Sequence, residues 1–370
     1  MKEEEKEEEE VIVERAYARV GLLGNPSDIY HGRTLAFAVK QFQASVTLTP
    51  NARREDSTVR VIPNEGLDLL SHSSIGEAHT TLRDRGFHGG TRLLLALLKV
   101  FVEQCKQKGI HLVSIKPRGF SLKYQSNVPF QVGLSGSSAI ICAGLRCLVR
   151  YYGVRDRLPK PELPNLMLKA ENDLGIVAGY MDRVIQVYGG LVSMDFDKEH
   201  FKRHGHGMYE ELDVSLLPPE LYLMFQREDK ADLHEEKASG DSGKMHSTVR
   251  ERWLKGEETV IEAMQEFRKI AEEGRRLLLQ GKLGEDFAAI MRRNFNLRRS
   301  LFGDEALGQS NLDMVSLAES CGAAAKFTGS GGAVVVYCPG GQDQATALKD
   351  KCETRGFSFL KLEVAPATAW

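Results

Sequence analysis

The sequence NVPFQVGLSGSSA, at residues 127–139, is the most informative stretch of this 370-residue chain. We predict a strand at residues 120–124 before it and a strongly apolar helix at residues 137–152 after it. Glycines let the backbone approach a ligand closely, and the first turn of a helix leaves N–H groups free for an anion. The stretch therefore indicates a phosphate-binding loop. The local pattern alone leaves a second interpretation open, in which a serine only caps a buried helix.

Two other kinds of phosphate-binding loop are excluded by the sequence. A GxxxxGK[ST] motif is absent, because Gly243-Lys244 lacks a glycine five residues before Gly243 and is followed by Met245. The glycine-rich turn at residues 329–332 continues into an apolar strand pattern and does not complete GxGxxG before a helix. A Walker-type nucleoside triphosphatase and a Rossmann dehydrogenase are therefore both disfavoured.

The composition is that of a globular protein, with 42% hydrophobic and 27% charged residues. The net charge is −2, and residues 2–10 hold seven Glu and two Lys, so the rest of the chain is weakly positive with dispersed Lys and Arg. We therefore expect no nucleic-acid partner. The apolar runs fall short of the ~18 residues of a membrane span, so no membrane is expected. Cysteines without CxxC pairs and an acidic N-terminus without an apolar signal favour a cytoplasmic location.

Helices and strands follow one another without strict alternation, which favours an α+β fold over a doubly wound sheet. We predict a disordered acidic tail at residues 1–10, an N-terminal domain at 11–217 that carries the loop, and a C-terminal domain at 218–370. The boundary is placed at Pro218-Pro219, before a new strand. Further strands are predicted at 11–23, 44–48, 59–62, 191–196, 221–225, 323–327, 333–337 and 360–364, and further helices at 91–107, 166–174, 246–281, 286–302, 311–321 and 344–355.

Three motifs, in this order along the chain, resemble those of the GHMP small-molecule kinases. They are ARVGLLGNPSD (18–28), similar to the substrate motif; PxxxGLSGSSA (129–139), similar to the ATP loop; and KFTGSGGAVVVYC (326–338), similar to the third glycine motif. Within this family the whole chain is similar to the plant-type glucuronokinases, through GNPSD, GLSGSSA, GIVAGYMDRVIQVYGG and GDSGKMHSTVRERW. The resemblance implies a GHMP kinase-like two-domain fold with the active site in the interdomain cleft.

The resemblance also implies roles for particular residues. Mg²⁺ would be bound by Ser138 and Glu171. Asp182 would be the catalytic carboxylate, which accepts the proton of the acceptor hydroxyl or orients it. Arg19 would stand beside it, where a fixed positive charge lowers the pKa of the acid and neutralises the moving phosphoryl group. ATP would be contacted by Pro129, Gly133, Leu134, Ser135, Gly136, Ser137, Ser138, Ala139, Gly329, Ser330 and Gly331.

Candidates for binding the sugar are Asn25, Asp28 and Arg183. For the carboxylate of a sugar acid, Arg183, Arg33 and Lys244 are candidates, since arginine suits bidentate recognition of carboxylates. Residues Ser242, Lys244 and Ser247 are candidates for a closing lid. Structural alternatives stay open at each place: a proline turn with an Asp cap at 25–28, an Arg183–Asp182 pair, and ordinary loop composition at 242–247.

The reaction implied by the resemblance transfers the γ-phosphate of ATP to the anomeric hydroxyl of D-glucuronate. The products are D-glucuronate 1-phosphate and ADP, a salvage step toward UDP-glucuronate. The expected partners are ATP and a small anionic sugar, and the sequence identifies no protein partner. Two alternatives are a GHMP kinase for galactose, arabinose or a mevalonate-type alcohol, and a non-catalytic sugar or nucleotide sensor. The sensor predicts loss of Asp182 or the loop serines, whereas the chain retains them.

Overall fold

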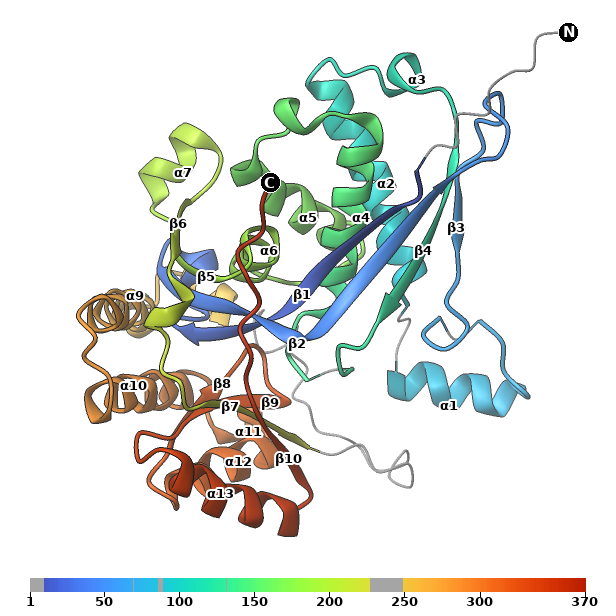
Figure 1. Cartoon of the computed structure of the whole chain (residues 1–370). Helices are drawn as coiled ribbons and strands as arrows, with labels where there is room; N and C mark the ends of the chain where they lie inside the picture. The colour runs from blue at the N-terminus through green and yellow to red at the C-terminus, as the bar shows by residue number, and fades with distance from the viewer. Residues whose placement is uncertain (1–9, 69, 86–88, 131, 227–248) are drawn as a thin grey trace, which may run out of the picture.

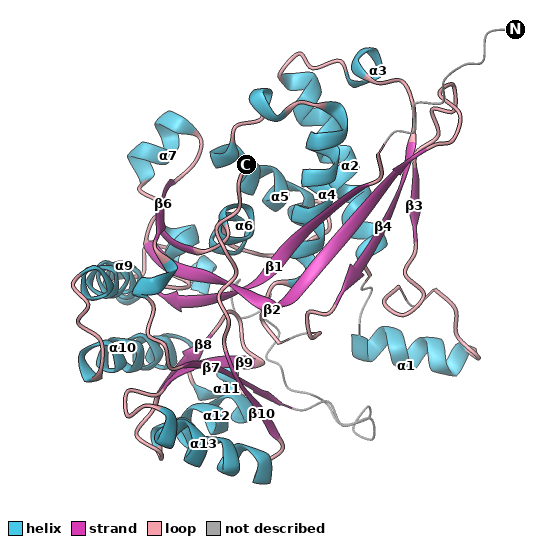
Figure 2. Ribbon diagram, viewed as in Figure 1, coloured by secondary structure: helices cyan, strands magenta, loops and turns pink. Residues whose placement is uncertain are grey.

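The computed structural model describes residues 10–68, 70–85, 89–130, 132–226 and 249–370 (Figure 1). These residues form two β-sheets flanked by helices, a mixed arrangement that agrees with the predicted α+β fold (Figure 2). Residues 1–9 of the acidic tail, and the predicted lid residues Ser242, Lys244 and Ser247, lie outside the described residues. None of the helices described is long and apolar enough to cross a membrane.

The first sheet is built around a long central strand, β2 (Arg33–Pro50). Its strand order is β3-β4-β2-β5-β6, and β1 also pairs with β2. Only residues 44–48 were expected to be a strand here, whereas β2 begins eleven residues earlier. Residues 34–39 are buried on both faces and so lack the alternation that marks a half-buried strand. The other strands are β1 (Ile12–Leu23), β3 (Arg60–Ile62), β4 (Phe120–Ser126), β5 (Leu191–Asp195) and β6 (Met208–Leu212).

Helices cover one face of the first sheet and enclose the larger hydrophobic core. The central one is α4 (Gly136–Tyr152), which packs on β1 and β2 and contributes Ile141, Leu145 and Leu148 to this core. Nearly every side chain of α4 is buried, as its apolar sequence predicts. Beside it lie α2 (Gly90–Gln107), α5 (Leu163–Asn172) and α6 (Met181–Tyr188) (Figure 1). Three further helices lie farther out: α1 (Ile75–Arg85), α3 (Leu112–Ile115) and α7 (Lys198–His204).

The second sheet is antiparallel, with the strand order β10-β7-β9-β8. One face packs on α12 and α13, and the other packs on β1, β2, α9 and α10. The elements are β7 (Leu221–Gln226), β8 (Ala324–Phe327), β9 (Ala333–Tyr337), β10 (Phe357–Lys361), α9 (Glu258–Leu279), α10 (Glu285–Phe302), α11 (Asp304–Leu307), α12 (Gln309–Glu319) and α13 (Gln342–Thr354). The single helix expected at 246–281 is wrong, because Gly256, with φ of 77°, breaks it before α9.

The last residues of the chain leave the second sheet and return to the first. Val364 forms a β-bridge with Val39, and Ala367 forms one with Gly189. The N–H of Thr368 donates to the carbonyl of Tyr188 at 2.7 Å. Figure 1 shows this C-terminal segment running from β10 toward α6. The chain therefore crosses between the two sheets once before β7 and once after β10, and the division at residue 218 stays a prediction.

Candidate active site

Three segments that are far apart in the sequence meet around the side chain of Arg19. Arg19 lies on β1 and is 4% exposed. Its Nη1 donates a hydrogen bond to the carbonyl oxygen of Gly133 at 2.6 Å, and the Thr328 hydroxyl donates to the same oxygen at 3.3 Å. The N–H of Gly21 donates to the Thr328 carbonyl at 2.9 Å. The first motif, the glycine–serine loop and the third motif therefore contribute to one site, where the two sheets meet.

Asp182 supplies the carboxylate at this meeting point. It lies in the first turn of α6, and Arg19 holds it with Nε at 2.5 Å from Oδ1 and Nη2 at 2.8 Å from Oδ2. The Ser135 hydroxyl also donates to Oδ2. Burial raises the pKa of Asp182, but the charges of Arg19 and Arg183 and these hydrogen bonds outweigh burial and lower it to about 2. The carboxyl group is therefore ionised at neutral pH.

The serines of the loop do not cap α4. Ser135 is the N-cap residue, yet its side chain accepts no hydrogen bond from the helix. Ser137 donates to Glu171 Oε1 at 3.0 Å, and Ser138 donates to the Ser135 carbonyl at 3.3 Å. The interpretation in which a serine only caps the helix is therefore wrong. Within the described part of the chain, the N–H groups of residues 136–138 have no hydrogen-bond acceptor, so the positive end of α4 is available to an anion.

The backbone of the loop is held in a conformation that needs its glycines. Gly133 has φ of 67°, and a Cβ there would lie 2.4 Å from the carbonyl oxygen of Gly331. Ser135 also has a positive φ, 63°, which is uncommon for a residue with a side chain. Gln186 on α6 stabilises this conformation, because its Nε2 donates to the Ser135 carbonyl at 2.8 Å. The loop is therefore positioned by the helix that carries Asp182.

The residues predicted to contact ATP differ in the exposure of their side chains. The side chains of Leu134 and Ala139 are packed in the two cores, at 1% and 0% exposure, so only their backbones face the loop. Pro129 and Ser330 are partly exposed. A Cβ on Gly329 would lie 2.5 Å from the Gly133 carbonyl oxygen, so the third motif requires a glycine there. These positions place the turn at residues 328–332 directly against the loop.

Glu171 and Arg183 form a fully buried ion pair behind the loop. Nε and Nη2 of Arg183 donate to Glu171 Oε2, and Nη1 donates to the Gly179 carbonyl at 2.8 Å. Glu171 is 0% exposed, and burial raises its pKa despite the charge of Arg183. Arg183 Nη1 also lies 3.6 Å from Asp182 Oδ2. The charged groups that Arg183 contacts are therefore Glu171 and Asp182. These contacts give no support to its predicted role in binding the sugar.

The same region contains the residues predicted to bind Mg²⁺. Ser138 on α4 and Glu171 on α5 offer the hard oxygen ligands that Mg²⁺ prefers, so their chemistry fits the ion. Each already has a hydrogen-bond partner, since Ser138 donates to a carbonyl and both oxygens of Glu171 accept hydrogen bonds. Among the described residues, no group of three His, Cys, Asp or Glu is placed to hold a metal. The protein alone therefore offers few ligands, as is usual where Mg²⁺ is bound largely through phosphates.

Asn25 and Asp28 lie in the turn that follows β1 and are both buried. Asn25 Oδ1 accepts a hydrogen bond from Lys326 Nζ at 2.8 Å. Asp28, in a short 3₁₀ helix (Ser27–Tyr30), accepts from the N–H of Met181 at 3.0 Å. Burial raises the pKa of Asp28 to about 6, with a contribution from Asp182. The turn is thus joined to α6, next to Asp182.

Sequence reasoning missed Lys326 as a residue of the site. Its side chain is 1% exposed, and Nζ donates to the carbonyls of Gly21 and Phe327 and to Asn25. Burial and the nearby Arg298 lower its pKa well below the usual value. Lys326 stands in the third motif, where a lysine on an otherwise apolar strand was the available signal. It connects β8 of the second sheet to the turn after β1.

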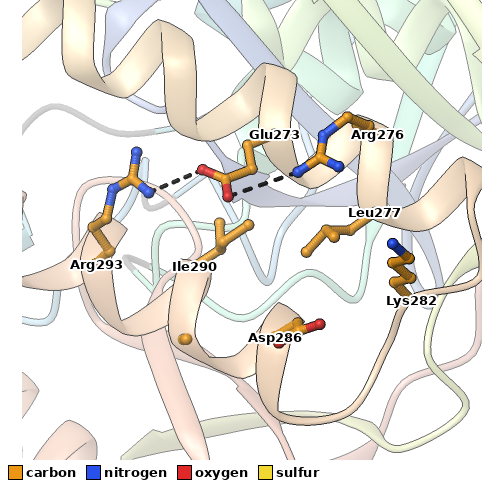
Figure 3. A pocket seen from close by; sticks show the side chains of 8 residues that line it. Glu273, Arg276, Leu277, Lys282, Asp286, Ile290 and Arg293 are labelled. Carbon is orange, nitrogen blue, oxygen red and sulfur yellow. Dashed lines mark hydrogen bonds and ion pairs between the residues drawn. The ribbon is translucent and has the colours of Figure 1, made fainter.

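A separate pocket of about 390 Å³ lies between α9 and α10 (Figure 3). Its charged residues pair with one another, since Glu273 contacts Arg293 at 2.9 Å and Arg276 at 3.9 Å. None of its lining residues belongs to the predicted site. This pocket is therefore distinct from the site around Arg19 and Asp182.

The comparisons with known proteins agree with this arrangement. Residues 92–190, which include the loop and Asp182, match the model of the GHMP kinases N terminal domain. The galactokinase of Lactococcus lactis, solved with galactose, superposes with a TM-score of 0.66 at 18% identity, covering 98% of this chain and 96% of its own. The mevalonate kinase of Methanococcus jannaschii gives 0.64 at 16% identity, covering 96% and 99%. These solved structures show that the fold is that of the GHMP kinases.

Two plant proteins are similar over nearly the whole chain. Glucuronokinase 1 of Arabidopsis thaliana is 46% identical over 356 residues, covering 96% of this chain and 93% of its own length. Probable glucuronokinase 2 of the same plant is 47% identical, covering 96% and 92%. The chain therefore belongs to the GHMP kinase family, in the group that contains these glucuronokinases.

The first prediction concerns Asp182. We expect Asp182→Asn to lower turnover by about three orders of magnitude, because it removes the charge at the point where Arg19, the loop and α6 meet. It should also lower the free energy of unfolding by about 3 kcal/mol, since Arg19 loses its buried partner. Steady-state kinetics and urea unfolding measure the two effects. Asp343→Asn, at an exposed position on α13, is the matched control and should change neither. Normal turnover in Asp182→Asn would remove Asp182 from the mechanism.

The second prediction concerns the pH dependence of stability. The pKa of Asp28 is about 6 in the folded protein and 3.8 in the reference state. Between these values the folded protein binds more protons than the unfolded chain, so the contribution of Asp28 to the free energy of unfolding falls as the pH rises. Asp28→Asn keeps an acceptor for the Met181 N–H and should remove this dependence. Above pH 7 it should be more stable than the parent by up to about 3 kcal/mol. Equal urea midpoints for both proteins at pH 5 and pH 8 would contradict this.

Proposed function

We propose that this protein transfers the γ-phosphate of ATP to the anomeric hydroxyl of D-glucuronate, giving D-glucuronate 1-phosphate and ADP. The observation that carries this proposal is the 46–47% identity, over 96% of the chain, to the two Arabidopsis glucuronokinases. The site agrees with a kinase, because an anion-binding helix terminus, an arginine and a carboxylate converge in it. A salvage role toward UDP-glucuronate and a cytoplasmic location stay predictions from the sequence.

ATP is the phosphate donor, and the start of α4 is the proposed binding site of its phosphates. The N–H groups of residues 136–138 point out of the helix without acceptors in the described chain, and the helix dipole favours negative charge there. Gly133 and Gly331 let two backbone segments approach each other closely. Arg19 adds a buried positive charge next to the loop. Phosphoryl transfer depends on positioning and charge stabilisation, which this arrangement supplies.

Asp182 is the proposed partner of the acceptor hydroxyl. With a pKa of about 2 it is a weak base at neutral pH, since a general base is most effective when its pKa is near the working pH. Its proposed contribution is therefore to accept a hydrogen bond from the hydroxyl and hold the attacking oxygen in line. Arg19 and Ser135 fix the carboxylate for this task, as both donate to it. Asn25 and Asp28 stay proposals for contacts to the sugar.

Mg²⁺ is proposed to accompany ATP, with Ser138 and Glu171 as the protein ligands. When bound, the ion supplies neutralisation of the phosphate charges. The support is the placement of a hydroxyl and a carboxylate on neighbouring helices at the start of α4. For Glu171 to bind the ion, its Oε1 gives up the hydrogen bond from Ser137, while Arg183 keeps its hydrogen bonds to Oε2.

The alternatives from the sequence have less support. The galactokinase of Dictyostelium discoideum is 32% identical but over only 46% of this chain and 32% of its own length. A sensor without turnover needs no carboxylate held by an arginine at the loop, and this chain holds Asp182 there with two hydrogen bonds from Arg19. An ATP-dependent sugar kinase is therefore the function that the site and the relatives support together.

A substrate panel tests the proposed reaction. With coupled detection of ADP, we expect kcat/KM for D-glucuronate to exceed that for galactose, arabinose or mevalonate by at least about 100-fold. An analogue that lacks a group which the site is built to bind leaves buried polar groups of the protein without a hydrogen-bond partner, and the site therefore rejects it. Identification of the product as the 1-phosphate by nuclear magnetic resonance completes the assignment. A preference for galactose would overturn the choice of substrate.

A second experiment tests the metal ligand. Ser138→Ala should raise the Mg²⁺ concentration that gives half-maximal turnover by about tenfold, because one oxygen ligand is lost. Ser320→Ala is the control and should leave the Mg²⁺ dependence unchanged, since Ser320 is an exposed serine outside the site whose hydroxyl also donates to a backbone carbonyl, that of Leu317. An unchanged Mg²⁺ titration in Ser138→Ala would exclude Ser138 as a ligand.

A further inference from the structure

A sugar acid brings a carboxylate into the site, and two of the three cations first suggested for it already have acidic partners. Arg183 is paired with Glu171. Arg33 contacts Asp195 at 2.7 Å and Glu272 at 3.1 Å. Lys244 lies outside the described residues. Within the described part of the chain, a cation that binds this carboxylate has to lie near the turn at residues 24–28 after β1 (the sugar turn) and to have hydrogen-bond donors that are still free.

Arg298 on α10 meets this requirement. Its side chain is 2% exposed, and its Nε and Nη2 are buried without any hydrogen-bond acceptor in the described structure. Its guanidinium group lies over the rings of Phe302 at 5.2 Å and Phe327 at 5.1 Å. Aromatic faces stabilise a cation only in part, and burying a charge without an opposite charge is costly. The arrangement is therefore one that an anion would stabilise.

The position of Arg298 connects it to the sugar turn rather than to the ATP loop. Asn294, one helical turn earlier on the same face of α10, accepts a hydrogen bond from the N–H of Gly24 at 2.8 Å. Gly24 precedes Asn25, which contacts Lys326 on β8. Arg298 is also close enough to Arg19 and Lys326 for charge repulsion: burial and then Arg19 lower its pKa to about 10. Arg298 thus lies beside the turn after β1, close to Arg19.

The unpartnered groups in this region are hydrogen-bond donors. Besides Nε and Nη2 of Arg298, Asn294 Nδ2 is buried without an acceptor in the described structure. The Tyr30 hydroxyl, in the short helix that follows the turn, is also buried without a partner there. A ligand that satisfies them must be rich in acceptors, and an ionised carboxylate is acceptor-only. Nε and Nη2 form the edge of the guanidinium group that Arg19 uses to hold Asp182, so the free edge of Arg298 suits bidentate binding.

We propose that Arg298, together with Asn294, binds the carboxylate of the sugar-acid substrate and determines the preference of the enzyme for acids over neutral sugars. The inference rests on the proposed function, since it names the residues that recognise that substrate. Arg298 is a specificity-determining residue and takes no part in the transfer of the phosphoryl group. Lys326 lies beside it, but its Nζ already donates hydrogen bonds to Gly21, Asn25 and Phe327.

The test compares Arg298→Gln with Arg299→Gln, which removes an equal charge at the next, exposed position, where Arg299 pairs with Asp304. The substrates are D-glucuronate and D-glucuronamide, which differ in the charge of one group. We expect Arg298→Gln to raise KM for glucuronate by about 10- to 100-fold, the value of a charge-assisted hydrogen-bonded pair. KM for glucuronamide and for ATP should stay within about threefold. Arg299→Gln should behave as the parent with all three.

A binding measurement separates recognition from a structural role. Glucuronate should raise the melting temperature of the parent but not that of Arg298→Gln, because a ligand stabilises only the form that binds it. Without ligand, Arg298→Gln should melt at or above the temperature of the parent, since the variant lacks an uncompensated buried charge. If Arg298→Gln does not fold, Arg298→Met is used and judged by the same ratios.

Three outcomes overturn the inference. An unchanged ratio of acid to amide in the Arg298 variant would show that the carboxylate is bound elsewhere. A rise in KM for ATP instead would assign Arg298 to the phosphates. If the parent turns over D-glucuronate and only the Arg298 result fails, the inference is wrong and the proposed function stands. If the parent does not turn over D-glucuronate at all, both are wrong.

Discussion

The site depends on the ion pair between Arg19 and Asp182. The two residues are 163 positions apart, and their contact joins β1 to the start of α6. Arg19 also reaches the Gly133 carbonyl, and Asp182 also accepts from Ser135, so both ends of the pair are attached to the loop. A charge buried as deeply as Arg19 needs its partner in good geometry. Packing of α4 and α6 against β1 therefore fixes the loop, the arginine and the carboxylate together.

Among the described residues, Arg298 is buried where the two sheets meet without an opposite charge. By contrast, Arg19 is paired with Asp182 and Arg183 with Glu171. A protein that bound only neutral ligands would gain nothing from an unpaired buried arginine, because a desolvated charge costs stability. A reaction between a polyphosphate and a sugar acid supplies several negative charges. The electrostatics of the site and the proposed pair of substrates therefore agree.

Much of the fold was predictable because its signals are local. The apolar period of α4 and the glycines before it are visible within residues 127–152. The extent of β2 was not, because the side chains of residues 35–39 belong alternately to two different hydrophobic cores, and burial on both faces removes the alternating pattern. In the site, Asp182 and Arg19 follow from the motifs. Arg298 did not, because it lies in no motif. The role of a buried arginine on a helix becomes visible only once the packing of the neighbouring elements is known.

The return of the C-terminal segment to the first sheet has a consequence for biosynthesis. Val364 and Ala367 bridge to Val39 and Gly189, so two contacts of the N-terminal half are made by residues that are synthesised after the whole second sheet. During translation that half emerges without them, and it stays incomplete until residues 364–367 have left the ribosome. Vectorial folding, domain after domain, therefore cannot finish the part that carries Arg19 and Asp182 before the second sheet has been synthesised.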